Sequence, residues 1–353
     1  MSTISNNYFG RYQLLEKIAS GGMGEVYKAK DPSVTPARLV ALKRIYPHLS
    51  HHPKYLALFM REAYITLQLQ HKNIVQVYEL GERHDELFIA MELIIGKHVG
   101  HYLATGDRLS AEEIALVGKD ILEALVYAHT HKEATVIHQD ISPENIILDD
   151  QGVAKLCDFG LARALRTATN VPERYVIGKL AYMAPEQFYN PDDATVDCGV
   201  DIYGLGVVLY ELLTGKRRFI AVTVEQLLIQ VKECAAVVDP SDLQHCPASF
   251  VSILERATAR AVTDRYSSAG EFLLALDGFL YHENIASIRE SLASHMLGTT
   301  EKAKQSEFET TDSLHAPTEW LDLKPQTLVS ADSTHPGDSR FKRLLRGLRA
   351  AMF

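Results

Sequence analysis

The chain has 353 residues, of which 46% are hydrophobic and 23% are charged, so it is long enough to bury one large core or two smaller ones. Its formal net charge is −9 at pH 7. This acidic balance argues against a general nucleic-acid-binding protein, because phosphate backbones select for basic surfaces.

The cysteines and the hydropathy of the chain narrow the class of protein and its compartment further. The four cysteines form no Cys-x-x-Cys pair and the histidines lack metal-ligand spacing, so no disulfide framework or zinc site is expected. Residues 1–10 contain no apolar signal-peptide core, and no run approaches the roughly 18 apolar residues that cross a bilayer. We therefore expect a soluble protein of the reducing cytoplasm.

The first hundred residues are predicted to form mainly β-strands. Their segments rich in Val, Ile, Leu and Tyr are short and are bounded by turn-forming residues. The predicted strands are residues 12–18, 25–29, 39–45, 74–80 and 87–92. Residues 55–69 are instead predicted to form a helix, because their apolar side chains recur at helical spacing.

Helices are predicted to dominate after residue 106. Ser110 followed by Glu113 matches a capping box, in which the serine oxygen and the glutamate each satisfy a free backbone N–H group. Apolar residues then recur every three to four positions as far as Ala128, which indicates a core-facing helix. Further helical patterns lie near residues 185–190, 200–214, 224–235, 248–260 and 268–281.

The composition changes after residue 284. Residues 299–339 are rich in Ser, Thr, Asp, Glu and Pro, and we expect residues 284–339 to be largely disordered, because they bury too little apolar surface to offset the entropy of ordering. Residues 340–353 interleave five basic side chains with apolar ones, as in a basic amphipathic helix. This segment could bind an anionic membrane surface or an acidic partner; the alternative is a disordered basic end that only improves solubility.

Glycine-rich and charged motifs follow one another along the chain. Residues 20–24 (Ser-Gly-Gly-Met-Gly) lie between two predicted strands, where glycines would let the backbone approach phosphate oxygens; a plain hairpin turn is the alternative. Lys43 ends a predicted strand, and Glu62 follows on the predicted helix. Alone, each is explained as a solvated side chain, whereas the functional interpretation pairs them.

Three further polar motifs complete the set. They are His-Gln-Asp at 138–140 with Asn145, Asp-Phe-Gly at 158–160, and Ala-Pro-Glu at 184–186. Each motif is unremarkable alone, but the whole set in this order is hard to explain by chance. Phosphoryl transfer needs a backbone cradle, a cation for the phosphates, metal ligands and a carboxylate near the incoming hydroxyl, and the set offers a candidate for each.

This ordered set resembles the eukaryotic-type (Hanks-type) serine/threonine protein kinases, and bacterial members of the family, over about residues 12–283. The resemblance implies an α+β, bilobal fold with a small strand-rich N-lobe (12–92) that contains one helix, and a larger helical C-lobe (97–283). Residues 1–11 would be an N-terminal extension. The implied activity is transfer of the γ-phosphoryl group of ATP to serine or threonine hydroxyls of protein substrates, in bacterial signalling.

Two other functions are compatible with the same resemblance. A pseudokinase would be a nucleotide-binding scaffold without turnover, and its signature would be loss of Lys43, Asp140 or Asp158, all of which are present. A small-molecule kinase of related fold is less well supported, because the Ala-Pro-Glu motif and the loop before it are associated with protein substrates. We therefore favour an active protein kinase.

The resemblance implies a role for each site residue. Lys43 would hold the α- and β-phosphates and pair with Glu62, and Asp140 would accept the hydrogen bond of the substrate hydroxyl. Asn145 and Asp158 would bind Mg²⁺, with Mn²⁺ as an alternative ion. The residues implied to surround ATP are Ile18, Ala19, Gly21, Gly22, Gly24, Val26, Ala41, Lys43, Met91, Glu92, Ile94 and Ile147.

The resemblance also implies two structural contacts in the helical lobe. Glu186 would pair with an arginine near the end of the domain, for which Arg265 is the candidate. Asp201 would anchor the loop that contains Asp140.

Gln139 and Ala19 depart from the family pattern. Gln139 replaces an arginine that usually contacts a phosphorylated activation loop, so a phosphate on Thr167 or Thr169 would lack this charged partner. Ala19 stands where the first glycine of the loop is usual, and we expect a modest effect.

Two further departures lie close to the catalytic aspartate. Ser142 replaces a lysine that usually helps to neutralise the γ-phosphate, and Lys179 replaces a threonine. In the family these positions face each other beside the catalytic aspartate. We infer an exchanged pair, in which Lys179 supplies the missing charge.

Overall fold

The computed structural model divides the chain into two units, residues 1–296 and 297–353, and the contacts below lie within the first. No helix in the described part of the chain is both long and apolar enough to cross a membrane. The backbone alone is described for Gly21, Tyr189, Lys232, Glu233 and residues 296–306. The structure describes residues 7–21, 24–47, 64, 66–83, 86–132, 134–159, 178–189, 196–219, 221, 223–233, 243 and 246–306.

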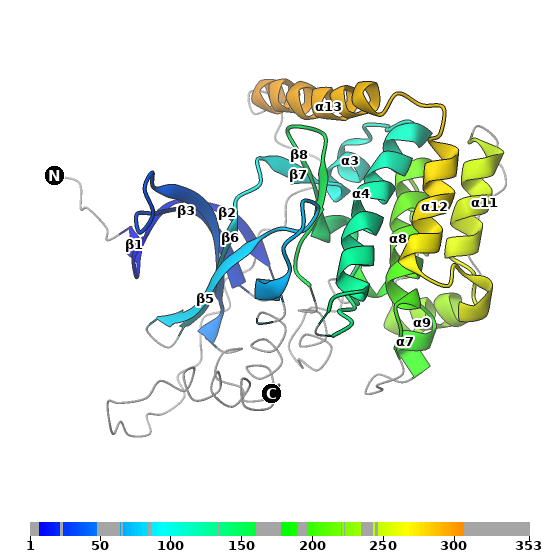
Figure 1. Ribbon diagram of the computed structural model, residues 1–353, viewed down its shortest axis with the longest axis horizontal. Coiled ribbons are helices and arrows are strands. Elements are labelled where there is room, and N and C mark those ends of the chain that lie inside the picture. The colour runs from blue at the N-terminus through cyan, green and yellow to red at the C-terminus, as the bar shows by residue number, and fades with distance from the viewer. Residues whose placement is uncertain are drawn as a thin grey trace. The chain divides into compact units, whose positions relative to one another are not determined.

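One antiparallel sheet forms most of the N-lobe that the structure describes, with its strands in the order β1-β2-β3-β4-β6-β5 (Figure 1). The strands are β1 (Tyr8–Phe9), β2 (Tyr12–Gly21), β3 (Gly24–Asp31), β4 (Arg38–Ile45), β5 (Val77–Arg83) and β6 (Glu86–Glu92). β5 begins later than predicted, because Ile74 instead forms a bridge to Leu156 outside this sheet. The helix predicted at 55–69 lies mostly outside the described residues; its end, 66–68, is helical.

The N-lobe begins earlier than the predicted boundary at residue 12. β1 pairs with β2, and Phe9 packs edge-on against Phe88 of β6 with ring centroids 5.5 Å apart. Arg11 donates a hydrogen bond to Asp31 at the end of β3. Residues 8–11 therefore belong to the lobe, because burying Phe9 removes apolar surface from water.

A second antiparallel sheet, in the order β7-β8-β9, belongs to the C-lobe. Its strands are β7 (Gly96–His98), β8 (Ile146–Asp149) and β9 (Ala154–Leu156). The turn between β8 and β9 contains Gly152, whose φ of 74° lies in the left-handed region that favours glycine. Asn145 directly precedes β8 and Asp158 follows β9 by two residues, so this hairpin positions both predicted metal ligands.

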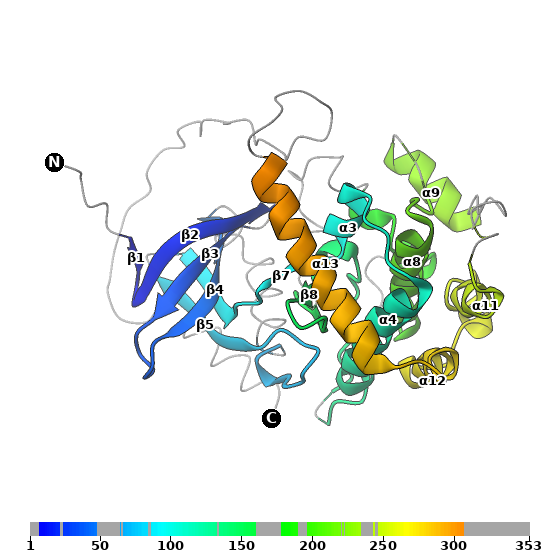
Figure 2. The same cartoon turned by 90° about the horizontal axis from the view of Figure 1, so that it is seen from above.

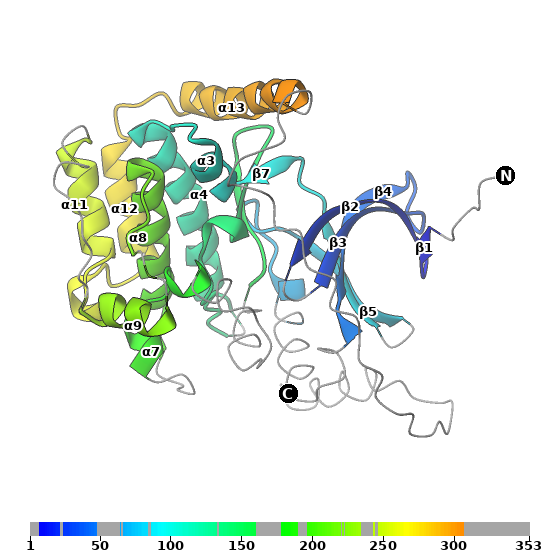
Figure 3. The ribbon, with the colours of Figure 1, turned by 180° about the vertical axis from the view of Figure 1, so that it is seen from behind.

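Helices form the rest of the C-lobe. They are α3 (Gly100–Thr105), α4 (Ala111–His129), η1 (Pro143–Asn145), α7 (Glu186–Tyr189), α8 (Gly199–Thr214), α9 (Val224–Glu233), α11 (Ala248–Ala257), η2 (Val262–Asp264) and α12 (Ala269–Phe279). α4 and α8 lie side by side, with α11 and α12 against them (Figures 2 and 3), and their buried side chains dominate the core. The predicted α+β fold, with one strand-rich and one helical lobe, is confirmed.

The predicted start of the long helix α4 is also confirmed. The Glu113 N–H donates to Ser110 Oγ at 3.1 Å, and the Ser110 N–H donates to the Glu113 carboxylate at 2.7 Å. These two bonds satisfy backbone groups that the first helical turn leaves without partners.

The disordered tail predicted from residue 284 requires a correction. Residues 285–306 form a helix, α13 (Ile285–Ser306), and Leu292 on it is fully buried in the C-lobe core. The low apolar content of the segment pointed to disorder, but a few well-placed side chains dock this helix onto the lobe. Residues 307–339 and the predicted basic helix at 340–353 lie outside the described residues.

Candidate active site

Strand register places several predicted nucleotide residues on one face of the N-lobe sheet. Val26 of β3 lies directly opposite Lys43 of β4, and Ala41 lies opposite Met91 of β6. Residues directly opposite each other share a face, as do residues two apart on one strand. Val26, Ala41, Lys43 and Met91 therefore line the same face.

The glycine-rich turn connects β2 to β3 at the end of this face. Gly21, the last residue of β2, pairs with Gly24, and Gly22 lies outside the described residues. A Cβ atom at Gly24 would lie 1.9 Å from the carbonyl oxygen of Arg44. A side chain at Gly24 would therefore push β3 away from β4.

The remaining predicted nucleotide residues come from three segments. Ile18 and Ala19 lie in β2, and Ile18 is 47% exposed. Ile94 lies between β6 and β7, and Ile147 lies in β8 and pairs with His98. The chain thus brings them from both lobes, although their contacts with a nucleotide stay a prediction.

The segment that joins the lobes is held by an ion pair. Lys155 Nζ of β9 lies 2.8 Å from a carboxylate oxygen of Glu92, the last residue of β6. The Glu92 backbone N–H also donates to the Gln76 carbonyl oxygen at 2.8 Å. The Glu92 carboxylate is therefore paired with a side chain of β9. This ion pair connects the predicted hinge to the strand that precedes Asp158.

Lys43 and Asp158 form the first charged cluster of the site. Lys43 Nζ donates to Asp158 Oδ2 at 2.8 Å, and 10% of the lysine side chain is exposed. Burial pushes the pKa of Asp158 up, but the Lys43 ammonium outweighs it, so this pKa lies below its ordinary value and the carboxylate is ionised. Glu62, the predicted partner of Lys43, lies outside the described residues.

The loop around Asp140 is anchored by a buried carboxylate, as predicted. Asp201 of α8 is fully buried and accepts the backbone N–H groups of His138 at 2.8 Å and Gln139 at 2.7 Å. Gln139 has φ of 63° and Asp158 has φ of 58°, a region that non-glycine residues adopt only when their surroundings hold them there. The anchor therefore holds a strained backbone directly before Asp140.

Asp140, Asn145 and Lys179 form the second charged cluster. Asn145 Nδ2 donates to the Asp140 carbonyl oxygen at 2.7 Å and to its Oδ2 at 2.9 Å. Lys179 Nζ lies 2.5 Å from the same Oδ2. Ser142 is buried, and its Oγ has no hydrogen-bond partner among the residues that the structure describes. The structure thus joins Lys179 to Asp140 across 39 residues.

The donor set at the two clusters fits a hard divalent cation. Asp158 offers an ionised carboxylate, and Asn145 offers its amide oxygen, because its Nδ2 is used by Asp140. The Cys157 N–H donates to the Asn145 carbonyl oxygen at 2.9 Å, which holds the two ligands near each other. Mg²⁺ prefers oxygen ligands and completes its shell with phosphates and water, so a two-residue set suits it.

The predicted Glu186–Arg265 pair is confirmed. Arg265 donates to both Glu186 carboxylate oxygens, at 2.7 and 2.9 Å, and its side chain is fully buried. The same guanidinium donates to the carbonyl oxygens of Ala259, Arg260 and Gly199. It therefore joins α7, η2 and the start of α8.

Two histidines that position the site were not predicted from the sequence. His138 Nδ1 accepts the Asp140 N–H at 3.2 Å and its Nε2 donates to the Cys157 carbonyl oxygen at 2.9 Å, so it links the two clusters. His129 of α4 lies 2.9 Å from Asp201 Oδ2. His138 could have been found from its place in the His-Gln-Asp motif, whereas the sequence near His129 offers no such signal.

Comparisons with known proteins agree with this geometry. Residues 12–274 match the protein kinase domain family. The chain is 34% identical to the serine/threonine-protein kinase PrkC of Bacillus subtilis over 75% of this chain, and 35% identical to the tyrosine-protein kinase MasK of Myxococcus xanthus over 77%. It spans only about 40% of the length of PrkC and 43% of MasK.

A solved structure supports the same assignment. The PknI kinase domain of Mycobacterium tuberculosis superimposes with a TM-score of 0.58 at 26% identity, over 79% of this chain and 99% of that one. The match includes both lobes, and the motifs occur in the family's order. The chain therefore belongs to the protein kinase domain family and resembles its bacterial serine/threonine members.

Proposed function

We propose that the chain is an ATP-dependent protein kinase that phosphorylates serine or threonine hydroxyls of other proteins. The observation that carries this proposal is the convergence of two charged clusters, Lys43–Asp158 and Lys179–Asp140–Asn145, at the open end of the β8–β9 hairpin. The family match supports it. The pseudokinase alternative is disfavoured, because the residues whose loss would mark it are present.

In the proposed reaction the substrate hydroxyl oxygen forms a bond to the γ-phosphorus of ATP. The bond from that phosphorus to the β–γ bridging oxygen breaks, and ADP leaves. The Asp140 carboxylate orients the hydroxyl and accepts its proton as the new bond forms. Lys43 holds the α- and β-phosphates, and Glu62 pairs with Lys43.

The nucleotide would lie against the shared face of the N-lobe sheet. Val26 and Ala41 would contact the purine from above and Ile147 from below, and the backbone of Glu92 and Ile94 would bind its edge. The end of β2 and the glycine-rich turn that follows it (together 18–24) would cover the phosphates. Mg²⁺, or Mn²⁺ in its place, supplies neutralisation of phosphate charge when bound, and Asn145 and Asp158 would hold it.

Lys179 is proposed to replace the cation that the chain lacks at position 142. Its ammonium lies against the Asp140 carboxylate, close to where a γ-phosphate and a substrate hydroxyl would meet. A lysine there offers a mobile point charge that can turn from a carboxylate to a phosphate oxygen. The buried Ser142 hydroxyl carries no charge for this task.

The proposal is tested by incubating the purified chain with labelled ATP and Mg²⁺, followed by mapping of the phosphorylated sites. We expect incorporation that requires Mg²⁺ and is absent from the Asp140→Asn variant. A wild-type chain that binds ATP but never incorporates phosphate would support the pseudokinase instead.

The same mapping decides the acceptor residue. One relative is named a tyrosine kinase and another a serine/threonine kinase, so the acceptor cannot be taken from their names. We expect phosphoserine and phosphothreonine on protein substrates. Phosphotyrosine as the main product would contradict the proposed acceptor but leave the kinase activity intact.

For residues 340–353 we propose contact with an anionic membrane surface or an acidic partner. The support is sequence alone, five basic residues interleaved with apolar ones. Each cation near an anionic surface contributes about 1 kcal/mol. Co-sedimentation with anionic liposomes should be lost in a chain that ends at Gly337; equal partitioning of the two chains would favour a role in solubility.

A further inference from the structure

The outer edge of strand β9 is held by Asp120 of α4 and by the segment before β5, which also binds the backbone of Leu156. β9 pairs with β8 on one edge, which leaves the backbone groups of Ala154 on the other edge open. The Ala154 N–H donates to Asp120 Oδ2 at 2.9 Å, and its carbonyl oxygen accepts Asn73 Nδ2 at 2.8 Å. Two side chains therefore satisfy both groups of a buried strand residue, as buried polar groups require.

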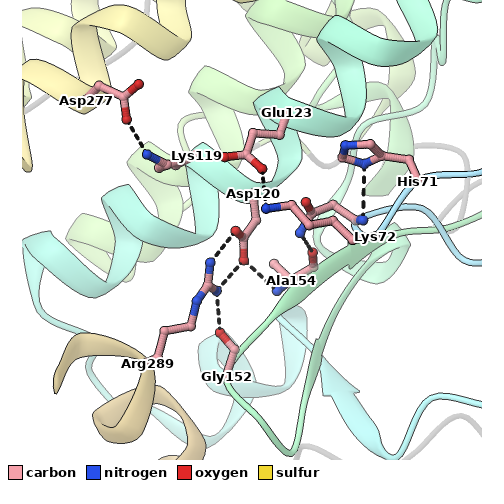
Figure 4. Close-up of polar contacts among 10 residues, drawn as sticks. His71, Lys72, Lys119, Asp120, Glu123, Gly152, Ala154, Asp277 and Arg289 are labelled. Carbon is pink, nitrogen blue, oxygen red and sulfur yellow. Dashed lines mark hydrogen bonds and ion pairs between the residues drawn. The ribbon is translucent and has the colours of Figure 1, made fainter. Parts of the chain in front are cut away.

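Asp120 is a buried carboxylate that needs a cation. It lies in the middle of α4 and is 1% exposed. Burial raises the pKa of Asp120 above its ordinary value, although Arg289 opposes this shift. Both Arg289 terminal nitrogens lie 2.5 Å from the Asp120 oxygens, and one also donates to the Gly152 carbonyl oxygen at 2.8 Å (Figure 4).

The cation comes from α13, beyond the last residue of the family match. The first half of this helix lies over α4 and the β8–β9 turn (Figure 1). A Cβ atom at Gly152 would lie 2.4 Å from the Arg289 carbonyl oxygen, so the turn and the helix are in close backbone contact. Ser291 and His295 bind the Glu113 carboxylate at 2.7 and 3.2 Å. The helix is therefore docked by polar contacts at two buried α4 carboxylates, Asp120 and Glu113, and by buried Leu292.

The docked hairpin leads directly to both candidate metal ligands. Asn145 precedes β8 without an intervening residue, and Asp158 is separated from β9 by Cys157 alone. A shift of β9 along or away from β8 therefore moves Asp158 relative to Asn145. The chain of contacts runs from Arg289 through Asp120 and Ala154 to these two residues.

We propose that Arg289 is a positioning residue for metal and nucleotide binding, and that α13 is a working part of the kinase rather than a passive tail. By neutralising Asp120, Arg289 keeps this carboxylate bound to the Ala154 N–H and so fixes the spacing of Asn145 and Asp158. The inference rests on the proposed function for its link to catalysis, but the coupling of α13 to β9 stands on the contacts alone.

The first test measures the hairpin without any reaction. Hydrogen–deuterium exchange of peptides from residues 146–158 is compared between wild type, Arg289→Ala and Arg289→Lys. Losing the Arg289 guanidinium should leave the Asp120 carboxylate buried without its partner. Exchange at β9 should therefore rise about tenfold or more in Arg289→Ala. Arg289→Lys, which keeps the charge but not the paired geometry, should lie between the two.

A matched control separates this coupling from general destabilisation. Lys119, next to Asp120 on α4, pairs instead with Asp277 of α12 at 2.5 Å (Figure 4). Among the residues that the structure describes, its side chain makes no hydrogen bond or ion pair with the β8–β9 hairpin. Lys119→Ala should leave exchange at 146–158 unchanged. Exchange that rises equally in Arg289→Ala and Lys119→Ala, or in neither, would overturn the inference.

The second test links the hairpin to the metal. Phosphate incorporation is measured against Mg²⁺ concentration at fixed nucleotide. Partners that orient metal ligands typically change metal affinity by about 10- to 100-fold, so Arg289→Ala should raise the half-saturating Mg²⁺ concentration about tenfold, with partial recovery in Arg289→Lys. An unchanged Mg²⁺ requirement would overturn the positioning role. If wild type shows no activity, the proposed function fails, while the exchange result still decides the coupling.

Discussion

The two lysines and the two arginines of the central ion pairs behave differently. Lys43 and Lys179 each bring one ammonium to a carboxylate at the active site. Arg265 and Arg289 bind carboxylates with two nitrogens at once and bind backbone carbonyl oxygens as well. A planar fork with five donors suits a permanent junction, whereas a compact ammonium on a flexible stem can change partners.

This difference suggests a division of roles. The arginines join segments that are far apart in the chain and whose arrangement must persist through a reaction cycle. The lysines lie where phosphate oxygens would compete for them. Losing an arginine should therefore cost mainly stability or positioning, and losing a lysine should cost mainly turnover.

The largest expected effect is on the lysine side. Lys43→Met and Asp140→Asn should each lower phosphate incorporation by at least about 10²-fold, because phosphate charge or the hydroxyl would lose its positioned partner. In Lys43→Met the free energy of unfolding should fall by less than in Arg265→Ala, because the lysine ammonium serves one carboxylate and no backbone carbonyl oxygen. Lys17→Met, which removes an exposed lysine paired with Glu25 on β3, should retain activity. A loss of stability in Lys43→Met as large as that in Arg265→Ala would contradict the proposed division of roles between lysines and arginines.

On the arginine side, Arg265→Ala should destabilise the fold by about 3–5 kcal/mol, because it leaves the Glu186 carboxylate and three carbonyl oxygens without their donor. Arg265→Lys should recover part of this, since an ammonium cannot reproduce the fork. Denaturant unfolding of both variants measures the difference. A stability within about 1 kcal/mol of wild type would contradict a structural role.

The Lys179 prediction tests the exchanged pair directly. Lys179→Thr should raise the barrier to phosphoryl transfer by about 2–4 kcal/mol, which lowers the rate about 30- to 900-fold. Ser142→Lys alone should also lower the rate, because two ammonium groups would crowd one site. The double variant should recover activity beyond the sum of the single effects. Steady-state rates of all four proteins on one peptide give the coupling energy. Simple additivity would leave Lys179 as an ordinary substrate-loop residue.

His129 is a third kind of cation, one whose charge depends on pH. The comparison of lysines and arginines can therefore be extended by measuring stability against pH. Burial lowers the pKa of His129, but Asp201 and Cys198 outweigh burial and raise it from 6.5 to about 9. Its stabilising contribution, about 3 kcal/mol, should be complete below pH 6.5 and lost as pH rises through about 9. His129→Gln keeps a donor for Asp201 without titrating. Unfolding curves from pH 6 to 10 should converge for the two proteins; parallel curves would argue against a charged His129.

The smallest expected effect concerns the activation loop. Thr167→Ala and Thr169→Ala should each retain most activity, because Gln139 has no charge to bind a phosphate at those positions. Initial rates on a protein substrate check this. A folded but nearly inactive variant would mean that another cation reads the phosphate, and the lysines and arginines compared above would be the first to examine.

Motifs with a local or family-wide pattern were predictable. The strands β2, β3, β4 and β6, the capping box at Ser110 and the Glu186–Arg265 pair all follow from residue spacing or from the resemblance. The chemistry-bearing residues at 140, 145 and 158 were predicted in the same way, and the structure brings the first two into direct contact.

Contacts without such a pattern were not predictable. Lys43 was expected to pair with Glu62, and its contact with Asp158 was not anticipated. Residues 8–11 were assigned to an extension because the short strand β1 has too few residues to show a period of two. The helix α13 was missed because its composition resembles a solvated tail.

By itself the sequence determined the fold class, the order of the motifs and the identity of the charged residues, because these depend on local spacing and side-chain chemistry. Only the tertiary structure decided which charges meet. Arg289 and Asp120 are 169 residues apart, and the sequence around each gives no indication that they pair. The pair forms because α4 places the buried Asp120 carboxylate beside the Ala154 N–H of β9, and α13 places Arg289 within reach of the same carboxylate. These positions depend on how the three elements pack, and no single segment of the sequence determines them.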